Sequence, residues 1–263
     1  MRYLTDFFNL VEQIILFVNI NIPFTMLHST RGIVLTHVRY GETSAIVHIY
    51  TELFGQQSYM VNSVRSARNK GKNVLMQPLT LLQMQVYHKP GKDIHRIKEF
   101  KVDYPFASIP FDQTKRSVAF FITEMMNRSF REVEANPQLF EYIVASVRML
   151  DTMPNASSFH LFFLGGLTRY LGLFPDLSDH SPNSWFDLQN GMFTNDITPY
   201  SQAVDSNDSL LWRNIFDMAG MNDIKMNSDQ RNRLTGYLID YYSLHLPGLG
   251  QIKSLDILQS LYL

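Results

Sequence analysis

The spacing of apolar residues changes near Pro110, and this change constrains the fold more than any other feature of the chain. Between Thr30 and Asp103, short runs rich in β-branched and aromatic residues are separated by turn residues every 8 to 12 positions, which is typical of β-strands. From Asp112 onward, apolar residues recur with a helical period of about 3.6 residues. We therefore expect an α+β protein in which a strand-rich unit precedes a helical one.

The strand-rich unit, residues 26–105, contains five short segments with a strand pattern. They lie at residues 33–35, 45–50, 57–61, 79–87 and 94–102. The fourth segment shifts its alternation at Met84, which indicates a β-bulge, and a hairpin turn is expected at residues 88–92. Five short strands without a long intervening helix predict a small closed barrel. Its size favours an OB-fold, although an SH3-like barrel fits the same pattern.

The remaining residues, 106–263, predict a bundle of α-helices. Three helices are expected to start near Asp112, at Asn136 with Pro137, and at Ser157 or Ser158. Further helices are expected over residues 208–219 and 228–244 and from Ser254 onward. Gly172 is a candidate C-cap of the third helix, and Gly165 and Gly166 within that helix would permit close packing. Residues 175–206, rich in Asp, Asn, Ser, Pro and Gly, are expected to form an irregular insert.

Residues 1–25 form an N-terminal extension whose apolar residues recur at helical spacing, which predicts a short amphipathic helix. Acidic and amide residues interrupt the apolar run and no small-residue cleavage site follows it, so neither a secretion signal nor a membrane span is expected. A second methionine, Met26, directly precedes the first strand. We hypothesise that translation starts at Met26, and an intact-mass measurement that found Met1 in the native chain would exclude this.

The chain contains no cysteine, which excludes disulfides, thiolate metal sites and a cysteine nucleophile, and which fits a reducing cytoplasmic environment. No phosphate-loop, serine-hydrolase, zinc-peptidase, dinucleotide-binding or calcium-loop motif occurs. Aspartates in loops usually cap turns, although a few residues of the insert could in principle hold a hard cation: Asp176, Asp179, His180, Asp187 and Asp196. His88 and His95 are expected at the surface of the hairpin. We expect no catalytic residue, no metal and no cofactor.

Charge is divided unevenly along the chain, although its total is only −1. Residues 26–104 carry eleven basic and five acidic side chains, a net charge of +6, whereas residues 111–263 carry eleven basic and seventeen acidic ones, a net charge of −6. A basic unit of this kind is typical of a polyanion-binding surface. The candidate DNA-binding residues are Arg31, Arg39, Arg65, Arg68, Lys70, Lys72, Lys89 and Lys92.

Four of these cations lie within eight residues, 65–72, without an acidic partner. Such a segment suits a nucleic acid because neutralised phosphates release condensed counterions, and neighbouring Ser and Asn side chains can donate to phosphate oxygens. Tyrosines are interleaved with the cations and could either stack on unpaired bases or pack in the barrel: Tyr40, Tyr50, Tyr59 and Tyr87.

Several short segments match a known family in their order and spacing over roughly 235 residues. They are Arg31-Gly32-Ile33-Val34-Leu35, Tyr40-Gly41-Glu42 with Ser44, Thr51, Gly55, the segment with Arg65, Arg68 and Lys70, Gln77-Pro78-Leu79, the hairpin from Tyr87 to Lys92, and Lys253-Ser254-Leu255. Through these segments the chain from Met26 onward resembles the RecO family of bacterial recombination mediators.

The resemblance implies an N-terminal OB-fold, a helical domain, and binding and annealing of single- and double-stranded DNA. It also implies that the protein works with RecR and the single-strand-binding protein SSB, and that together they help load RecA at gaps. Many members carry a four-cysteine zinc site where this chain has residues 174–194 without cysteine. We therefore expect no zinc and an insert held by apolar packing of Trp185, Phe186, Leu188 and Phe193.

Three functions remain open from the sequence, and an enzyme of unrecognised type ranks behind them. The first is a non-enzymatic, cytoplasmic and nucleoid-associated DNA annealing and mediator protein, with the helical domain as the platform for protein partners. The second is a protein-binding adaptor whose barrel holds an acidic partner. The third is an RNA-binding OB-fold factor, which shares the electrostatics but would depend on 2′-hydroxyl groups.

Overall fold

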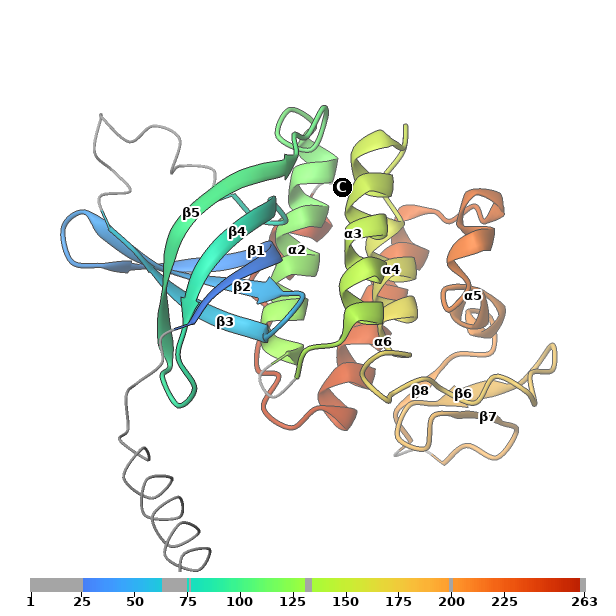
Figure 1. Cartoon of the computed structure of the whole chain (residues 1–263). Coiled ribbons are helices and arrows are strands. Elements are labelled where there is room, and N and C mark those ends of the chain that lie inside the picture. Colours follow the sequence, from blue (N-terminus) through green and yellow to red (C-terminus); the bar gives the residue numbers. More distant parts are fainter. Residues whose placement is uncertain (1–25, 63–74, 76, 131–133, 199–200, 261–263) are drawn as a thin grey trace, which may run out of the picture.

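The computed structural model describes residues 26–62, 75, 77–130, 134–198 and 201–260, so the helix expected within residues 1–25 lies outside the described residues. Five strands form a closed barrel in the order β1-β2-β3-β5-β4 (Figure 1). They are β1 Met26–Tyr40, β2 Ser44–Thr51, β3 Gly55–Val61, β4 Leu81–His88 and β5 Ile94–Tyr104. Together with the helices that follow, this barrel confirms the expected α+β fold with an N-terminal OB-fold.

Strand β1 closes the barrel because it pairs with β4 along its first half and with β2 along its second half. Gly32 lies where the two pairings meet, and a Cβ there would come within 2.7 Å of Cγ2 of Ile49 and 2.5 Å of Cε of Met84. The missing side chain lets these two residues fill the barrel interior.

Between β4 and β5, Gln85 pairs with Glu99 and Val86 with Ile97, so the extra residue, Lys98, lies in β5. The bulge expected in the fourth strand is therefore in its partner strand, and β4 itself pairs with β1 without a shift.

Helices follow the barrel and pack beside it (Figure 1). They are α2 Gln113–Ser129, α3 Pro137–Thr152, α4 Phe159–Leu167, α5 Ser209–Asn214, the 3₁₀ helix η2 Met218–Asp223, α6 Ser228–His245 and α7 Leu255–Ser260. The expected caps are present, since the side chains of Asp112 and Asn136 accept hydrogen bonds from backbone N–H groups three residues on. Within the described part of the chain, no helix has the length and apolar character needed to cross a membrane.

Two expected helices differ from their observed bounds. Helix α4 ends at Leu167, and a series of tight turns continues to Gly172, whose φ of 71° lets the N–H of Leu173 reach the carbonyl oxygen of Thr168. Gly172 therefore ends the turns rather than the α-helix. The helix expected over 208–219 is also shorter, because α5 ends at Asn214 and a 3₁₀ helix begins only at Met218.

The glycine pair in α4 allows close packing, as expected. A Cβ on Gly165 would lie 2.3 Å from the carbonyl oxygen of Ile215, and one on Gly166 would lie 2.4 Å from the hydroxyl of Tyr142. Both distances are far below van der Waals contact, so α4 can approach the segment after α5 and the side chain of Tyr142 only because these positions lack side chains.

The insert contains a small sheet in the order β7-β6-β8, with β6 Trp185–Asp187, β7 Met192–Thr194 and β8 Ala203–Val204. Phe186, Leu188 and Phe193 are buried as expected, but Trp185 is only partly buried. Trp212 of α5 supplies the missing aromatic contact, with its ring centroid 5.2 Å from that of Phe186. Trp185 is only partly buried because neighbouring residues of a strand point to opposite faces, and Phe186 next to it points to the buried face.

The barrel and the helices share one apolar core. Ile33, Tyr50 and Leu81 lie side by side on the outer face of the barrel, and all three are buried against the helical domain. The ring of Tyr50 lies 4.9 Å from that of Phe130 and 6.3 Å from that of Phe140. A second cluster fills the barrel interior. Burial of this outer face fixes the barrel against the helices.

The segment that leaves the barrel is held by a single buried carboxylate, Asp151, at the end of α3. Its oxygens accept hydrogen bonds from the backbone N–H groups of residues 107, 108 and 109 at 2.8 to 2.9 Å, and from the hydroxyl of Tyr104 at 3.2 Å. Lys115 donates to the backbone carbonyl of Asp151 at 2.8 Å. Burial alone would raise the pKa of Asp151, but these donors outweigh it, so the pKa lies below its usual value.

We expect Asp151→Asn to lower the free energy of unfolding at pH 7 by about 3 kcal/mol, because an amide cannot accept the same set of buried N–H donors. A carboxylate with a lowered folded-state pKa contributes stability above its ordinary pKa of about 3.9, and this stability is lost as the pH falls through the folded-state value. Urea unfolding of the variant should therefore show a smaller loss of stability on acidification. The exposed control Asp196→Asn should resemble the parent in both respects, and an Asp151→Asn variant with unchanged stability would contradict this role.

Candidate nucleic-acid interface

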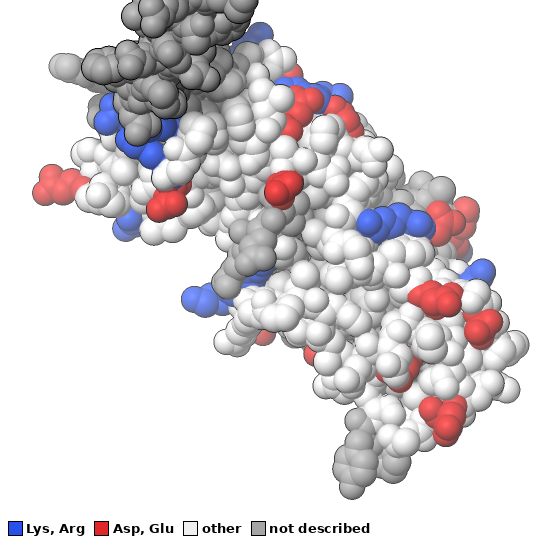
Figure 2. Space-filling model, turned by 60° about the horizontal axis from the view of Figure 1, so that its bottom comes forward, with Lys and Arg blue, Asp and Glu red and all other residues white. Residues whose placement is uncertain are grey.

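The eight candidate cations occupy different surroundings. Residues 65, 68, 70 and 72 lie outside the described residues, so four of the eleven basic side chains of the barrel region are not placed. On the face shown in Figure 2, acidic side chains predominate over the helical end at the right, whereas the barrel end at the left carries both signs. The described barrel surface is thus less basic than the sequence count suggests, and the excess comes largely from residues 65–72.

Arg31 lies at the junction between the barrel and α3. Its guanidinium donates to Glu52 at 2.9 and 2.7 Å and to Glu141 of α3, and it stacks 4.9 Å from the ring centroid of Phe140. The hydrogen bonds that Arg31 donates to Glu52 and Glu141 raise the pKa of Arg31 further above its usual range. Because two carboxylates already neutralise Arg31, we leave it out of the proposed DNA surface.

Arg39 lies at the end of the β1–β2 hairpin and is exposed. Arg39 pairs with Ala45, which is buried inside the barrel, so the two residues lie on the inner face of their strands. Arg39 is nevertheless exposed because it lies at the open rim of the barrel. Tyr40 follows it and is also exposed. This turn is therefore one described place where a cation and an aromatic ring are both accessible.

Lys89 and Lys92 lie on the turn between β4 and β5, where the N–H of Lys92 donates to the carbonyl oxygen of Lys89 at 3.3 Å and Gly91 has a φ of 76°. The turn rests on stacked rings. The ring centroid of His88 lies 4.0 Å from that of Phe54 and 4.3 Å from that of His95. The backbone N–H of Lys89 donates to Nδ1 of His95 at 3.5 Å.

The two histidines correct the expectation of surface residues, because His95 is only 3% exposed and His88 is half-buried. Burial lowers the pKa of His95, and the neighbouring His88 and Lys92 lower it further. Burial likewise lowers the pKa of His88. Both rings are therefore neutral at pH 7 and serve to anchor the turn, so that its two lysines project from a fixed base.

The four interleaved tyrosines divide into two pairs. Tyr50 and Tyr59 are fully buried, in the shared core and in the barrel interior respectively, so neither can stack on a base. Tyr40 and Tyr87 are 55% and 38% exposed. Strand alternation separates Tyr59, which faces the barrel interior, from Tyr87, which faces outward. Tyr50 lies on the outer face and is buried because the helices cover it there.

A groove of about 730 Å³ separates the outer surface of β1 and β2 from α2 and α7. Glu124 forms part of its lining and accepts hydrogen bonds from Arg128 at 3.0 Å and from the N–H and hydroxyl of Ser254 at 2.8 and 2.7 Å. Burial alone would raise the pKa of Glu124, but these donors lower it below its usual value. Sequence reasoning missed Glu124, although its spacing of four residues from Arg128 on one helix was a visible signal.

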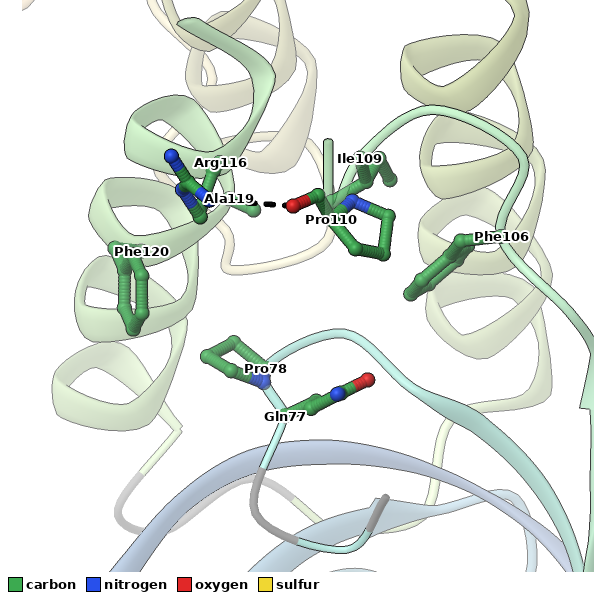
Figure 3. Close-up of a pocket in the computed structure, with 8 residues that line it drawn as sticks. All are labelled: Gln77, Pro78, Phe106, Ile109, Pro110, Arg116, Ala119 and Phe120. Atoms are coloured by element: carbon green, nitrogen blue, oxygen red, sulfur yellow. Dashed lines mark hydrogen bonds between the residues drawn. The ribbon is translucent and has the colours of Figure 1, made fainter. Parts of the chain in front are cut away.

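A smaller apolar pocket of about 170 Å³ lies between the segment before β4 and the start of α2 (Figure 3). Its lining consists of Gln77, Pro78, Phe106, Ile109, Pro110, Arg116, Ala119 and Phe120. The one charged group, Arg116, donates to the carbonyl oxygen of Pro110 at 3.2 Å. This pocket therefore presents apolar surface rather than a set of reactive groups.

The aspartates of the insert mainly cap turns. Asp176 accepts from the N–H of Ser178 at 2.9 Å, and Asp187 accepts from the N–H of Gln189 at 2.8 Å. Among the residues that the structure describes, no group of three or more histidine, aspartate or glutamate side chains is arranged to hold a metal ion.

Comparison with known proteins gives the same result for both parts of the chain. Residues 26–106 match the family "Recombination protein O N terminal", and residues 110–256 match "Recombination protein O C terminal". DNA repair protein RecO of Bacteroides fragilis is 39% identical over 242 residues, which cover 90% of this chain and 100% of that protein. The RecO protein of Phocaeicola vulgatus is 38% identical over 90% of this chain and all of its own length. The RecO protein of Flavobacterium psychrophilum is 31% identical over 89% of this chain and 98% of its own. The chain therefore belongs to the RecO family of DNA repair proteins.

Proposed function

We propose that the protein is a non-enzymatic DNA-binding factor of recombinational repair that binds single- and double-stranded DNA through its barrel and anneals complementary strands. The observation that carries the proposal is the combination of RecO family membership with a barrel region of net charge +6. Cations on the barrel neutralise phosphates of two strands at once and so lower their mutual repulsion. In the cell it acts at the nucleoid.

Within the described residues, the phosphate contacts fall to Arg39, Lys89 and Lys92, which lie on two turns of the barrel. Arg65, Arg68, Lys70 and Lys72 stay part of the proposed surface on the strength of the sequence. Lys89 and Lys92 carry the better structural argument, because the stacked rings of His88 and His95 hold their turn in place. A preformed site does not have to be ordered when DNA binds.

The helical domain supplies the platform for protein partners in this proposal. It carries a net charge of −6 over residues 111–263, so it does not compete with the barrel for DNA. RecR and SSB are the proposed partners, and through them the protein helps load RecA at gaps covered by SSB. The shared apolar core keeps this platform at a fixed orientation to the barrel.

We expect single-stranded DNA binding to weaken with salt with an exponent near −4, which corresponds to about six phosphate contacts. The double variant Lys89→Glu/Lys92→Glu should reduce the magnitude of this exponent by about 1.4, at about 0.7 for each lost contact. Fluorescence anisotropy with a labelled oligonucleotide at several salt concentrations measures both values. The charge-matched control Arg213→Glu/Lys225→Glu, on the helical domain, should leave the exponent unchanged.

Three outcomes would count against the proposal. Binding that does not depend on salt, or that is absent at low salt, would favour an acidic protein partner for the barrel. Much tighter binding of an RNA of the same sequence would favour an RNA-binding factor. Annealing of complementary strands that proceeds equally well with Arg65→Glu/Arg68→Glu/Lys70→Glu would remove that segment from the mechanism.

Arg31 and Arg39 provide a matched pair that separates structure from binding. Arg31→Gln should lower the free energy of unfolding by about 1 kcal/mol, since it breaks a partly exposed ion-pair cluster, and should leave the salt exponent unchanged. Arg39→Gln should do the reverse, with unchanged stability and an exponent reduced in magnitude by about 0.7. Urea unfolding and anisotropy on both variants test this, and a salt effect confined to Arg31→Gln would overturn the assignment.

A further inference from the structure

A cluster of aromatic rings, which we name the ring column, lies at the end of the barrel that carries the β4–β5 turn, the lower end of the barrel in Figure 1. The rings of Phe54, His88 and His95 follow one another, with centroids 4.0 and 4.3 Å apart and interplanar angles of 6° and 28°. Tyr59 lies 6.0 Å from His95, and His28 lies 6.3 Å from His88. These rings come from β1, the β2–β3 turn, β3, β4 and β5. The ring column therefore joins the segments that meet at this end.

The β4–β5 turn is tied to the ring column by a hydrogen bond that depends on the protonation state of His95. The backbone N–H of Lys89 donates to Nδ1 of His95 at 3.5 Å. A neutral imidazole accepts at Nδ1 only when its proton is on Nε2, and an imidazolium carries protons on both nitrogens. Protonated His95 would therefore point an N–H group at the N–H group of Lys89. The bond exists only while His95 is neutral.

The surroundings of His95 offer little compensation for a positive charge. His95 is 3% exposed, and no described residue accepts a hydrogen bond from its Nε2. Burial lowers the pKa of His95, as do His88 and Lys92, whereas Asp93 raises it. Burial raises the pKa of Tyr59, so its hydroxyl stays neutral and supplies no counter-charge. The titratable and charged groups around the ring column are His28 of β1, Tyr59 of β3, His88 of β4, and Lys89, Lys92 and Asp93 of the turn.

His88 can carry a charge at a lower cost than His95. It is half-buried, and the ring of Phe54 stacks on it at 4.0 Å, where an aromatic face stabilises a cation. Burial and the neighbouring His28 still lower the pKa of His88. Glu52 lies two residues before Phe54, but its carboxylate is paired at the junction with α3. The protonation state of His95 therefore decides whether the turn stays bound.

We propose that the ring column is a pH-sensitive switch, which holds the β4–β5 turn closed while His95 is neutral and releases the turn when His95 takes up a proton. In the opened turn, His95 meets water and its pKa returns to about 6.5. Because this pKa is lower in the closed turn, opening takes up a proton below about pH 6.5 and is independent of pH above it. The switch is a property of the turn, and it operates whether or not the barrel binds DNA.

Native-state hydrogen exchange of the backbone N–H groups of Lys89 and Lys92 measures the switch. After correction for the intrinsic effect of pH on exchange, the opening equilibrium should rise about fivefold from pH 7 to pH 5.5, within the limit of about tenfold per pH unit for one proton. At each pH these two amides should open more readily than those of Val47 and Ile49 in β2, because the opening is local. Opening that does not change with pH, or that equals the opening of β2, would overturn the switch.

His95→Phe keeps a ring in the ring column but neither accepts from Lys89 nor takes up a proton. Its turn should open more often than that of the parent at pH 7, and it should lose most of the rise on acidification, which leaves the smaller contribution of His88. His48→Phe is the matched control, because His48 also has a pKa lowered by burial but lies on β2, where it bonds to Ser58 at 3.0 Å. The control should keep the rise of the parent. A full rise in His95→Phe, or its loss in His48→Phe, would overturn the assignment to His95.

Two variants of the turn change its charge without altering the ring column, so they test the switch even if His95→Phe does not fold. Lys92→Gln removes a cation that lowers the pKa of His95, so the total rise in opening, measured to its plateau, should be smaller than in the parent. Asp93→Asn removes a carboxylate that raises this pKa, so the total rise should be larger. Changes in the same direction, or no change in either variant, would contradict the switch.

Discussion

The arrangement of this molecule depends on one buried carboxylate. Asp151 gathers three consecutive backbone N–H groups of the segment that leaves the barrel, and it holds that segment against the end of α3. At the other end of the same helix, Arg31 ties β1 to Glu141. Between these two polar contacts runs the apolar core that the barrel and the helices share. The outer face of the barrel is divided as a result, with one side buried against helices and the other left exposed.

This division decides what each cation can do. Arg31 lies on the side that faces the helices, where its guanidinium contacts two carboxylates and the ring of Phe140. Arg39 and Lys92 lie on turns at the open side and are exposed. A basic residue counted in the sequence therefore adds positive charge to the surface only where the fold gives it no acidic partner. The same reasoning separates Tyr50, which closes the core, from Tyr87, which faces outward.

The sequence predicted the fold well because the fold depends on local periodicity. The five strands and the caps at Asp112 and Asn136 follow from patterns within a few residues. The bulge was expected in β4 but lies in β5, because the pairing of two strands decides which of them carries the extra residue. The site was harder to predict, since the direction of a side chain depends on pairing between distant strands. The pairing of Arg31 with Glu141 could not be seen in the sequence, because the two residues are 110 positions apart. His95 was expected at the surface because a turn signal does not reveal the ring stack beneath it.

The aromatic cluster of the insert gives this part of the molecule a distinctive response to temperature. Phe186, Phe193 and Trp212 hold three very short strands by burial of apolar surface. Stabilisation of this origin weakens on cooling, because apolar hydration carries a large heat-capacity change. The insert should therefore loosen in the cold before the barrel does, since its strands are only two or three residues long and add few ladder hydrogen bonds to this burial, whereas the barrel strands are seven to fifteen residues long.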